Sequence, residues 1–354
     1  MSRFLSPKYK NLEPYTPGEQ PKAMKYIKLN TNESPFEPSE KAQAAAKEAI
    51  GSLQLYSDPE VKGLKKILAK TFGVSEDEVL PTNGSDEILN FAFMAFCDKD
   101  KGAAFADITY GFYPVFAEIN NIPYTKIPLK EDFTIDITEY FNLGKTIFIA
   151  NPNAPTGIAL TISQIREILE HNRDSVVVID EAYVDFGAES CVPLIYEYDN
   201  LLVAQTFSKS RSMAGARLGF GIGCKQLIAD LNAIKYSTNP YNVNAMTMAA
   251  GIGALSDEEY TKQNCKTIME NRAWLQKELA LLGFETTDSL SNFVFAKHKS
   301  ADGEQLYLTL KQNGILVRHF SSPRISQYLR ITVGTLDDMK TLVKTLKKIL
   351  EETK

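Results

Sequence analysis

The feature that most constrains the fold is a series of short apolar runs, each followed by a segment with helical spacing, in the middle of the chain. Several runs are continuously apolar rather than alternating, as expected for strands covered on both faces of a sheet. The runs cover residues 103–108, 124–129, 146–150, 176–179, 201–206 and 218–222. Strands that alternate with helices in this way predict an α/β fold with a large, mostly parallel sheet.

The length and the change in pattern along the chain predict more than one domain. A chain of 354 residues exceeds the usual size of a single hydrophobic core. After about residue 256 a long helical pattern is followed by three strand-like runs and a C-terminal helix, and the runs cover residues 291–296, 315–319 and 328–333. We therefore expect an N-terminal arm over 1–45 that packs with the small domain, a large domain over 46–258 and a smaller α+β domain over 259–354.

Charge and composition argue against several classes of protein. The formal net charge is −5, whereas a protein that binds nucleic acid non-specifically normally has a basic excess. No apolar run approaches the roughly 18 residues of a membrane helix, and residues 1–18 lack the apolar segment of a signal peptide. The four cysteines and three histidines are scattered, which indicates neither a disulfide framework nor a metal site. We expect a cytoplasmic protein without metal, nucleic acid or membrane.

Four polar clusters follow the ends of apolar runs, where open α/β sheets bind their ligands. In the first cluster, Lys209 follows the run 201–206. A lone lysine is usually a solvated surface group, but one held just past a strand is partly desolvated, which lowers its pKa and frees the amine for a Schiff base. Thr206 and Ser208 add hydroxyl groups, and Arg217 adds a bidentate fork that suits a phosphate.

The second cluster is Asp180 with Tyr183, at the end of the run 176–179. A carboxylate in this position can pair with a protonated pyridine nitrogen and keep the ring an electron sink. Tyr183, three residues later, can reach a hydroxyl group of the same ring. Asp180 taken alone is equally consistent with a helix or turn cap.

The third cluster is the segment 151–157, Asn-Pro-Asn-Ala-Pro-Thr-Gly, in which two prolines and a glycine fix a rigid turn. We expect Asn153 to donate a hydrogen bond to a phenolate oxygen from this turn. As a turn motif alone, the segment is only moderately specific.

The fourth cluster is Gly84-Ser85-Asp86, which opens the helical run 88–97. A glycine–serine step at a helix start presents free backbone amides and the positive end of the helix dipole to a phosphate. An ordinary capping box explains the same residues. Further along the chain, Tyr110 supplies a ring that can stack on a cofactor.

Taken in order, these clusters resemble the fold-type I, aspartate-aminotransferase-like enzymes that use pyridoxal 5'-phosphate (PLP), and the resemblance covers nearly the whole chain. It implies that Lys209 carries the cofactor and moves a proton between substrate and cofactor. It also implies that Asp180 pairs with the pyridine nitrogen, that Tyr183 and Asn153 contact the ring oxygen, and that Tyr110 stacks on the ring. The residues implied at the phosphate are Gly84, Ser85, Asp86, Thr206, Ser208 and Arg217.

Within that superfamily the chain is similar to the histidinol-phosphate aminotransferases. The similarity is carried by LNTNESP at 29–35, LYSDPE at 55–60, VRHF at 317–320, PRI at 323–325 and YLRITVG at 328–334. It implies transfer of an amino group between L-histidinol phosphate and 2-oxoglutarate in histidine biosynthesis, by a homodimer in which Tyr56 reaches the neighbouring subunit's site. The residues implied at the substrate are Tyr15, Asn30, Tyr56, Arg318 and Arg330.

The chain departs from this pattern in two places. Many relatives have asparagine directly before Pro-Thr-Gly, where this chain has Ala154, so we assign the ring-oxygen contact to Asn153. Ser57 and Asp58 also stand where many relatives pass directly from tyrosine to proline.

Three other functions are weighed against this one. The nearest is an aromatic amino-acid aminotransferase, and the next is a lyase that decarboxylates a phosphorylated amino acid such as threonine phosphate. Both place arginines around their substrates, so the sequence separates them poorly. A non-enzymatic PLP-binding regulator is disfavoured, because the motifs begin near residue 29 and leave no room for a DNA-binding module.

Overall fold

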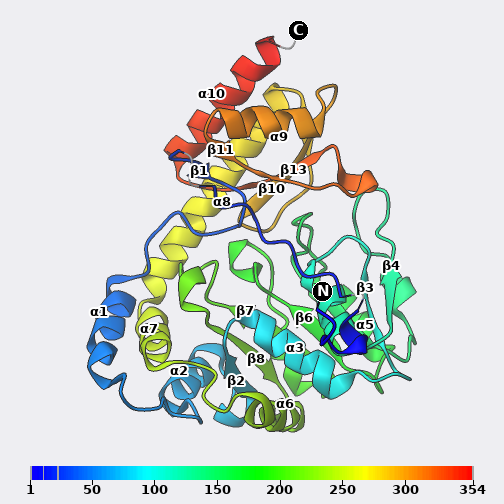
Figure 1. The fold of residues 1–354 in the computed structure, drawn as a ribbon, viewed down its shortest axis with the longest axis vertical. Helices are drawn as coiled ribbons and strands as arrows, with labels where there is room; N and C mark the ends of the chain where they lie inside the picture. Colours follow the sequence, from blue (N-terminus) through cyan, green and yellow to red (C-terminus); the bar gives the residue numbers. More distant parts are fainter. Residues whose placement is uncertain (1, 11, 22–23, 353–354) are drawn as a thin grey trace.

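A seven-stranded sheet forms the centre of the lower part of the molecule (Figure 1). The computed structural model describes residues 2–10, 12–21 and 24–352. The spatial order of the strands is β2 (Val79–Thr82), β8 (Gly219–Gly223), β7 (Leu201–Thr206), β6 (Val177–Asp180), β5 (Thr146–Ala150), β3 (Ala103–Ala106) and β4 (Tyr124–Ile127). Strand β8 runs opposite to the other six strands of this sheet. The prediction of a large, mostly parallel sheet is confirmed.

Helices cover both faces of the large sheet, which explains why its central strands are continuously apolar. One face is covered by α2 (Lys62–Phe72), α5 (Ile162–Glu170) and α7 (Ala245–Leu255). The other face is covered by α3 (Ser85–Phe96), α4 (Phe112–Ile119) and α6 (Lys225–Thr238). Successive strand residues alternate between the two layers. In β5, Ile149 belongs to the first layer, whereas Phe148 belongs to the second and stacks on Phe93 at 4.0 Å between ring centroids.

A second, antiparallel sheet lies above the first in Figure 1. Its strands, in order, are β12 (Arg318–His319), β13 (Tyr328–Thr332), β10 (Phe293–His298) and β9 (Phe284–Thr286). The helices that pack on it are α8 (Glu258–Leu281), α9 (Gly303–Gln312) and α10 (Leu336–Glu352). Helix α8 rises from the level of the large sheet to the small one, and thereby links the two parts of the molecule (Figure 1).

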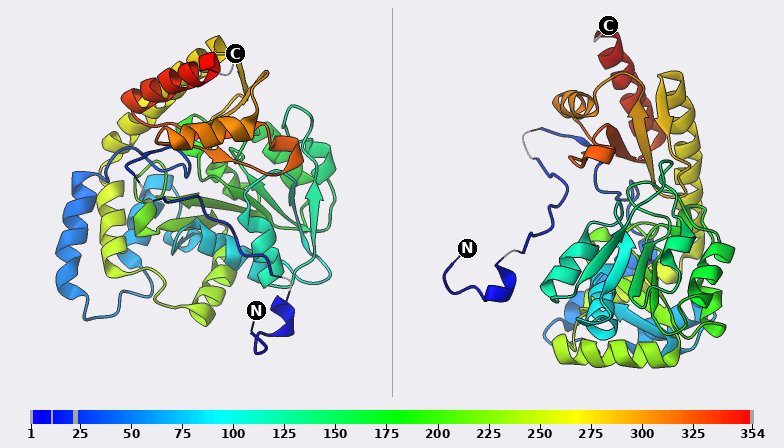
Figure 2. Two further views of the ribbon diagram at one scale, coloured as in Figure 1. Left: turned by 45° about the horizontal axis from the view of Figure 1, so that its top comes forward. Right: turned by 90° about the vertical axis from the view of Figure 1, so that its right-hand side faces the viewer.

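The N-terminal arm contacts the part of the molecule that contains the small sheet. Strand β1 (Ile27–Lys28) pairs in parallel with β11 (Ile315–Leu316). Leu29 extends this contact, because its carbonyl oxygen accepts a hydrogen bond from Thr332 N at 2.9 Å. Figure 2 shows the arm passing from there along the outside of the large-sheet part. Helix α1 (Glu40–Ala49), which begins before residue 45, the expected end of the arm, packs against α7.

The described residues contain neither a membrane-spanning helix nor a cluster of metal ligands. None of their helices is both long and apolar enough to cross a membrane. No group of three or more His, Cys, Asp or Glu side chains among them is arranged to hold a metal ion.

Candidate active site

The strand directions bring all four sequence-predicted clusters to one edge of the large sheet. Strands β5, β6 and β7 are parallel and end at Ala150, Asp180 and Thr206. Strand β2 runs in the same direction, because it and β7 are both antiparallel to β8. Arg217 reaches this edge immediately before β8 begins. The polar residues that follow or precede these strand ends therefore lie side by side.

Lys209 lies partly buried in the loop after β7. Its Nζ donates a hydrogen bond to the Thr31 carbonyl oxygen at 3.3 Å and lies 5.9 Å from the centroid of the Tyr183 ring. Burial, reinforced by the nearby charge of Arg330, lowers the pKa of Lys209 to about 8. The neutral, nucleophilic form of the amine is therefore more accessible near neutral pH than in an ordinary lysine.

Asp180 is a buried carboxyl group, and no salt bridge to it occurs among the described residues. Tyr113 Oη donates a hydrogen bond to its Oδ2 at 3.1 Å, and the Ala182 backbone N–H donates to its Oδ1 at 3.2 Å. Burial raises the pKa of Asp180 to about 7. A cation held against this carboxylate would offset the cost of burying its charge.

The start of helix α3 forms a cradle for an anion. Its N-cap, Gly84, has a φ of 77° and provides no side-chain cap, so the first backbone N–H groups of α3 have no partner from a capping side chain. A Cβ atom at this position would lie 2.6 Å from Arg217 Nη2, so only glycine allows the guanidinium to approach so closely. Thr206 and Ser208 lie at the end of β7, with Thr206 Oγ1 donating to Ser208 Oγ at 2.9 Å.

Asp86 acts as a counterion within this cradle. Its Oδ2 accepts a hydrogen bond from Arg217 Nη2 at 2.7 Å, and its Oδ1 accepts one from Tyr110 Oη at 2.6 Å. A carboxylate repels a phosphate, so we expect only the backbone N–H of Asp86 to face one. Its side chain instead fixes the orientations of Arg217 and Tyr110.

Asn153 does not have the free donor that we expected. Its Nδ2 already donates both hydrogens, to the Ile108 carbonyl oxygen at 3.0 Å and to Thr156 Oγ1 at 3.1 Å. Its Oδ1 accepts a hydrogen bond from Thr109 Oγ1 at 2.8 Å. The expected donation from Asn153 to a ring oxygen is thus inconsistent with this arrangement. The side chain instead fixes the turn against the segment after β3.

Arg318 and Arg330 form a pair of cations on the small sheet. They are register partners on the antiparallel strands β12 and β13, so their side chains start from opposite positions on one face. Both are partly buried. Two like charges that face each other are unfavourable unless an anion lies between them. This pair is suited to bind an anionic group of a substrate.

Arg330 also has an unused hydrogen-bond donor. Its Nη2 donates to the Asn30 carbonyl oxygen at 3.0 Å, whereas its Nε is buried without a partner. Burial lowers the pKa of this guanidinium, which reflects how poorly its charge is solvated. Asn30 Oδ1 is likewise buried without a partner. Both atoms have bonding capacity that a ligand can use.

The two tyrosines predicted at the substrate occupy different places. Tyr15 stacks on Phe112 at 4.2 Å between ring centroids, and its phenol is close enough to Arg330 to affect the pKa of that guanidinium. Tyr56 is 84% exposed and stacks on Tyr241 at 4.6 Å. Within one chain, therefore, Tyr15 belongs to the cluster and Tyr56 lies at the surface.

Two residues of the cluster were not predicted from the sequence. Tyr113 holds Asp180 from helix α4, and the signal that could have identified it is its place in the same aromatic segment as Tyr110, which precedes that helix. Asn32 donates from its Nδ2 to Tyr183 Oη at 2.9 Å, across 151 residues of sequence. No local pattern predicts such a contact.

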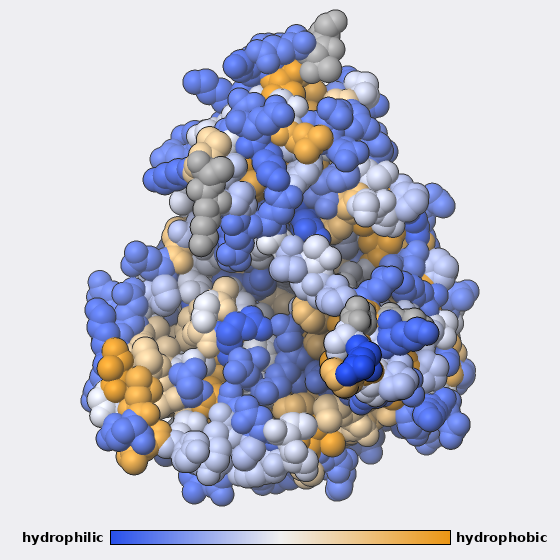
Figure 3. Space-filling view, viewed as in Figure 1, coloured by the Kyte–Doolittle hydropathy of each residue, from blue (hydrophilic) through white to orange (hydrophobic). Residues whose placement is uncertain are grey.

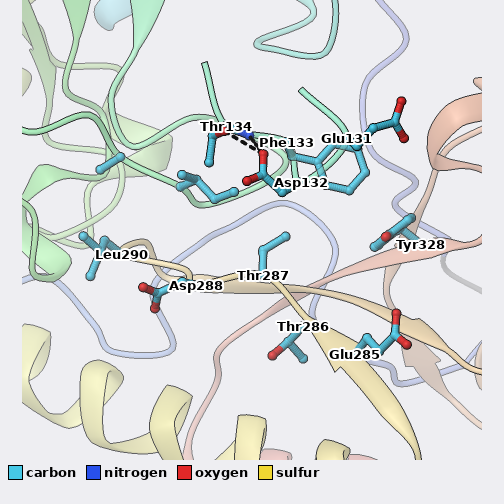
Figure 4. A pocket seen from close by; sticks show the side chains of 12 residues that line it. Glu131, Asp132, Phe133, Thr134, Glu285, Thr286, Thr287, Asp288, Leu290 and Tyr328 are labelled. Carbon is cyan, nitrogen blue, oxygen red and sulfur yellow. Dashed lines mark hydrogen bonds between the residues drawn. The ribbon is translucent and has the colours of Figure 1, made fainter. Parts of the chain in front are cut away.

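A cavity of about 480 Å³ lies elsewhere, between the loop after β4 and the segment after β9 (Figure 4). Four carboxylates line it, together with Phe133 and Tyr328; they are Glu131, Asp132, Glu285 and Asp288. None of the sequence-predicted site residues lines this cavity. It is therefore distinct from the cluster around Lys209.

Comparison with known proteins shows the family of the chain. The family model "Aminotransferase class I and II" matches residues 24–346. The chain is 50% identical to a histidinol-phosphate aminotransferase of Brachyspira hyodysenteriae, over 99% of this chain and 100% of the relative. It is 45% identical to a histidinol-phosphate aminotransferase of Clostridium botulinum, again over 99% and 100% of the two chains.

A solved structure has the same fold. The histidinol-phosphate aminotransferase of Sinorhizobium meliloti, in complex with pyridoxal-5'-phosphate, matches with a TM-score of 0.89 and 21% identity. The match covers 100% of this chain and 99% of that one. The expected fold class is therefore confirmed over the whole chain.

Proposed function

The chain belongs to the class I and II aminotransferases and, within them, to the histidinol-phosphate aminotransferases, and we propose on that basis that it transfers an amino group between L-histidinol phosphate and 2-oxoglutarate in histidine biosynthesis. Glutamate is the amino donor in the biosynthetic direction. The enzyme is a PLP-dependent transaminase. The observation that supports the proposed substrate most directly is the pair of facing arginines on the small sheet. One of them has a buried hydrogen-bond donor without a partner.

The residues at the sheet edge fit PLP. Bound PLP supplies an electron sink that stabilises negative charge on a substrate carbon. The buried, uncompensated carboxyl of Asp180 suits the cationic ring nitrogen. The start of α3 and Arg217 suit the phosphate, and Lys209 has the lowered pKa needed to hold the cofactor covalently.

Each side chain then has a role in the reaction. Lys209 would hold the cofactor, and its amine would take the proton from the substrate carbon as a general base. Tyr183 would donate its hydroxyl hydrogen to the ring oxygen, and Tyr110 would stack on the ring. The phosphates of cofactor and substrate would be held apart, because the first cradle lies at the start of α3 and the arginine pair lies on the small sheet.

Arg330 and Arg318 bind the substrate phosphate, with Tyr15 and Asn30 beside them. A fork of two guanidinium groups gives geometry as well as charge. Removal of water from this region strengthens each contact, since the guanidinium of Arg330 is already poorly solvated.

We also propose a homodimer, in which Tyr56 contacts the partner's site. The support is an exposed apolar patch between α1 and α2, where Ile50, Leu53 and Leu55 are each at least half exposed. Figure 3 shows apolar surface gathered at this place, at the lower left. An exposed apolar patch of this kind marks an interaction surface. A cytoplasmic location and the division into residues 1–45, 46–258 and 259–354 are part of the same proposal.

Product analysis tests the proposed reaction. With L-histidinol phosphate we expect glutamate to form only when 2-oxoglutarate is present, with one keto product for each glutamate. Carbon dioxide release from O-phospho-L-threonine would instead identify a lyase. Turnover of L-phenylalanine at an equal kcat/KM would identify an aromatic aminotransferase.

A further inference from the structure

Three consecutive residues of the N-terminal arm each contact one side chain of the candidate site. The Asn30 carbonyl oxygen accepts from Arg330, the Thr31 carbonyl oxygen accepts from Lys209, and Asn32 Nδ2 donates to Tyr183 Oη. The arm is thus part of the site wall. Of the three residues, only Asn32 uses its side chain for the contact.

Asn32 is held by four hydrogen bonds that come from both parts of the molecule. Its backbone N–H donates to Thr332 Oγ1 at 2.9 Å, and Thr332 Oγ1 donates to its Oδ1 at 3.1 Å. Its carbonyl oxygen accepts from Asn292 Nδ2 at 3.0 Å, and its own Nδ2 donates to Tyr183 Oη at 2.9 Å. The residue is 1% exposed. Every polar group of Asn32 is therefore satisfied, and its carboxamide cannot rotate without breaking a bond.

The backbone of Asn32 is also unusual. Its φ is 55°, in the left-handed region that few residues other than glycine and asparagine adopt. This conformation places the carboxamide of Asn32 against Tyr183 while its backbone remains bonded to Thr332 and Asn292 of the small-sheet side. The arm thereby joins the tyrosine of one part of the molecule to two side chains of the other.

The donor and acceptor roles decide the orientation of the Tyr183 hydroxyl. A phenol has one O–H hydrogen and accepts through its oxygen. Because Tyr183 Oη accepts from Asn32, its own hydrogen remains available for another acceptor. The ring is held by Phe293, edge to face at 5.1 Å between centroids, so the hydroxyl has little freedom to move.

We propose that Asn32 is a positioning residue for the transamination: by donating to Tyr183 Oη, it leaves the Tyr183 hydrogen free to be donated to the ring oxygen of PLP. This inference rests on the proposed contact of Tyr183 with the cofactor. Asn32 itself touches neither cofactor nor substrate in this account. Its hydrogen bond also opposes the effect of burial on the pKa of Tyr183, which burial raises.

Two variants separate the carboxamide from the backbone. Asn32→Gly removes both side-chain bonds, while glycine retains the left-handed conformation and the backbone bonds to Thr332 and Asn292. Asn32→Asp keeps the size of the side chain, but an ionised carboxylate can only accept hydrogen bonds. The Tyr183 hydroxyl must then donate its hydrogen to that carboxylate. Asn121→Gly is the matched control, because Asn121 has a φ of 57° in an exposed turn outside the site.

The test is a double-mutant cycle with Tyr183→Phe, read from the dissociation constant of PLP by equilibrium dialysis. We expect Asn32→Gly to weaken PLP binding about tenfold, within the range for one lost hydrogen bond, and Asn121→Gly to leave it unchanged. In the Tyr183→Phe background, Asn32→Gly should change the constant less than twofold, because its effect passes through the missing hydroxyl.

The second readout is the pH midpoint of the absorbance of the bound cofactor. Asn32→Asp and Tyr183→Phe should both raise it, because each withdraws a donor that stabilises the deprotonated cofactor. An unchanged midpoint and PLP affinity in Asn32→Asp would overturn the inference, as would equal losses from Asn32→Gly in both backgrounds. If Tyr183→Phe alone leaves PLP binding and the midpoint unchanged, the proposed contact of Tyr183 fails, and the role of Asn32 fails with it.

Discussion

Replacing Asp180 with asparagine in the cofactor-free protein should change how its stability depends on pH. Burial raises the pKa of this carboxyl from its ordinary value of 3.8 to about 7. A tenfold change in a proton-binding constant corresponds to about 1.4 kcal/mol, so ionising Asp180 costs about 4 kcal/mol more in the folded protein than in the unfolded chain. This energetic cost is what a cationic cofactor ring would remove.

The sign of the effect follows from proton linkage. Between about pH 5 and pH 7 the unfolded chain has lost this proton, whereas the folded protein retains it for most of the range. The free energy of unfolding therefore falls as the pH rises, by about 2 kcal/mol over this interval from Asp180 alone. Asp180→Asn removes the titrating group, so the wild-type protein should lose about 2 kcal/mol relative to the variant.

Urea unfolding at several pH values, at one protein concentration and followed by circular dichroism, measures this difference. Asp230→Asn is the matched control, because Asp230 is exposed on α6, and it should follow the wild-type curve. A constant gap between wild type and Asp180→Asn across the interval would refute the reasoning. Asp180 would then be solvated or paired with a cation in the apoprotein.

Three further predictions concern the cofactor, the substrate and the partner subunit. Gly84→Ala should weaken PLP binding roughly tenfold in equilibrium dialysis, because it strains a left-handed residue and displaces Arg217; unchanged binding would place the phosphate elsewhere. Arg330→Gln should lower kcat/KM for L-histidinol phosphate roughly 10- to 100-fold through loss of a charged hydrogen bond. If the variant lowers kcat/KM for L-histidinol phosphate less than it lowers kcat/KM for L-phenylalanine, a phosphate-binding role is contradicted. Mixing inactive Lys209→Ala chains with Tyr56→Phe chains should restore activity, because one site of the mixed dimer combines Lys209 of one chain with Tyr56 of the other. If Tyr56 acts within its own chain, the mixture should show no recovery.

The parts of the fold that depend on local pattern could be predicted from the sequence. Each of the six apolar runs in the middle of the chain overlaps a strand of the large sheet. Burial on both faces selects continuous apolar residues in the central strands, whereas the edge strand β4 is partly exposed. The run 315–319 was expected as one strand but is two. Ile315–Leu316 pairs with the arm and Arg318–His319 pairs with β13, and neither distant partner is visible in the local sequence.

The candidate site also contains residues that could be predicted from the local sequence and residues that could not. Asp180 and Lys209 could be identified because Asp180 ends the buried strand β6 and Lys209 lies just after the buried strand β7, and a strand end restricts where a side chain points. The expectation for Asn153 was inconsistent with the structure because its hydrogen bonds depend on Ile108 and Thr109, more than 40 residues away. Asn32 was overlooked for the same reason, since its role depends on a contact between the arm and Tyr183.

A single-turnover absorbance experiment on the PLP-loaded protein tests the central claim most directly. L-Histidinol phosphate, L-phenylalanine and O-phospho-L-threonine are added separately without any keto acid, and the visible band of the lysine-bound cofactor is followed. We predict rapid loss of this band with L-histidinol phosphate and slow or no loss with the other two, and no such band in Lys209→Ala. Equally fast loss with L-phenylalanine would contradict the substrate assignment, and a wild-type protein without a visible band would contradict the role of Lys209.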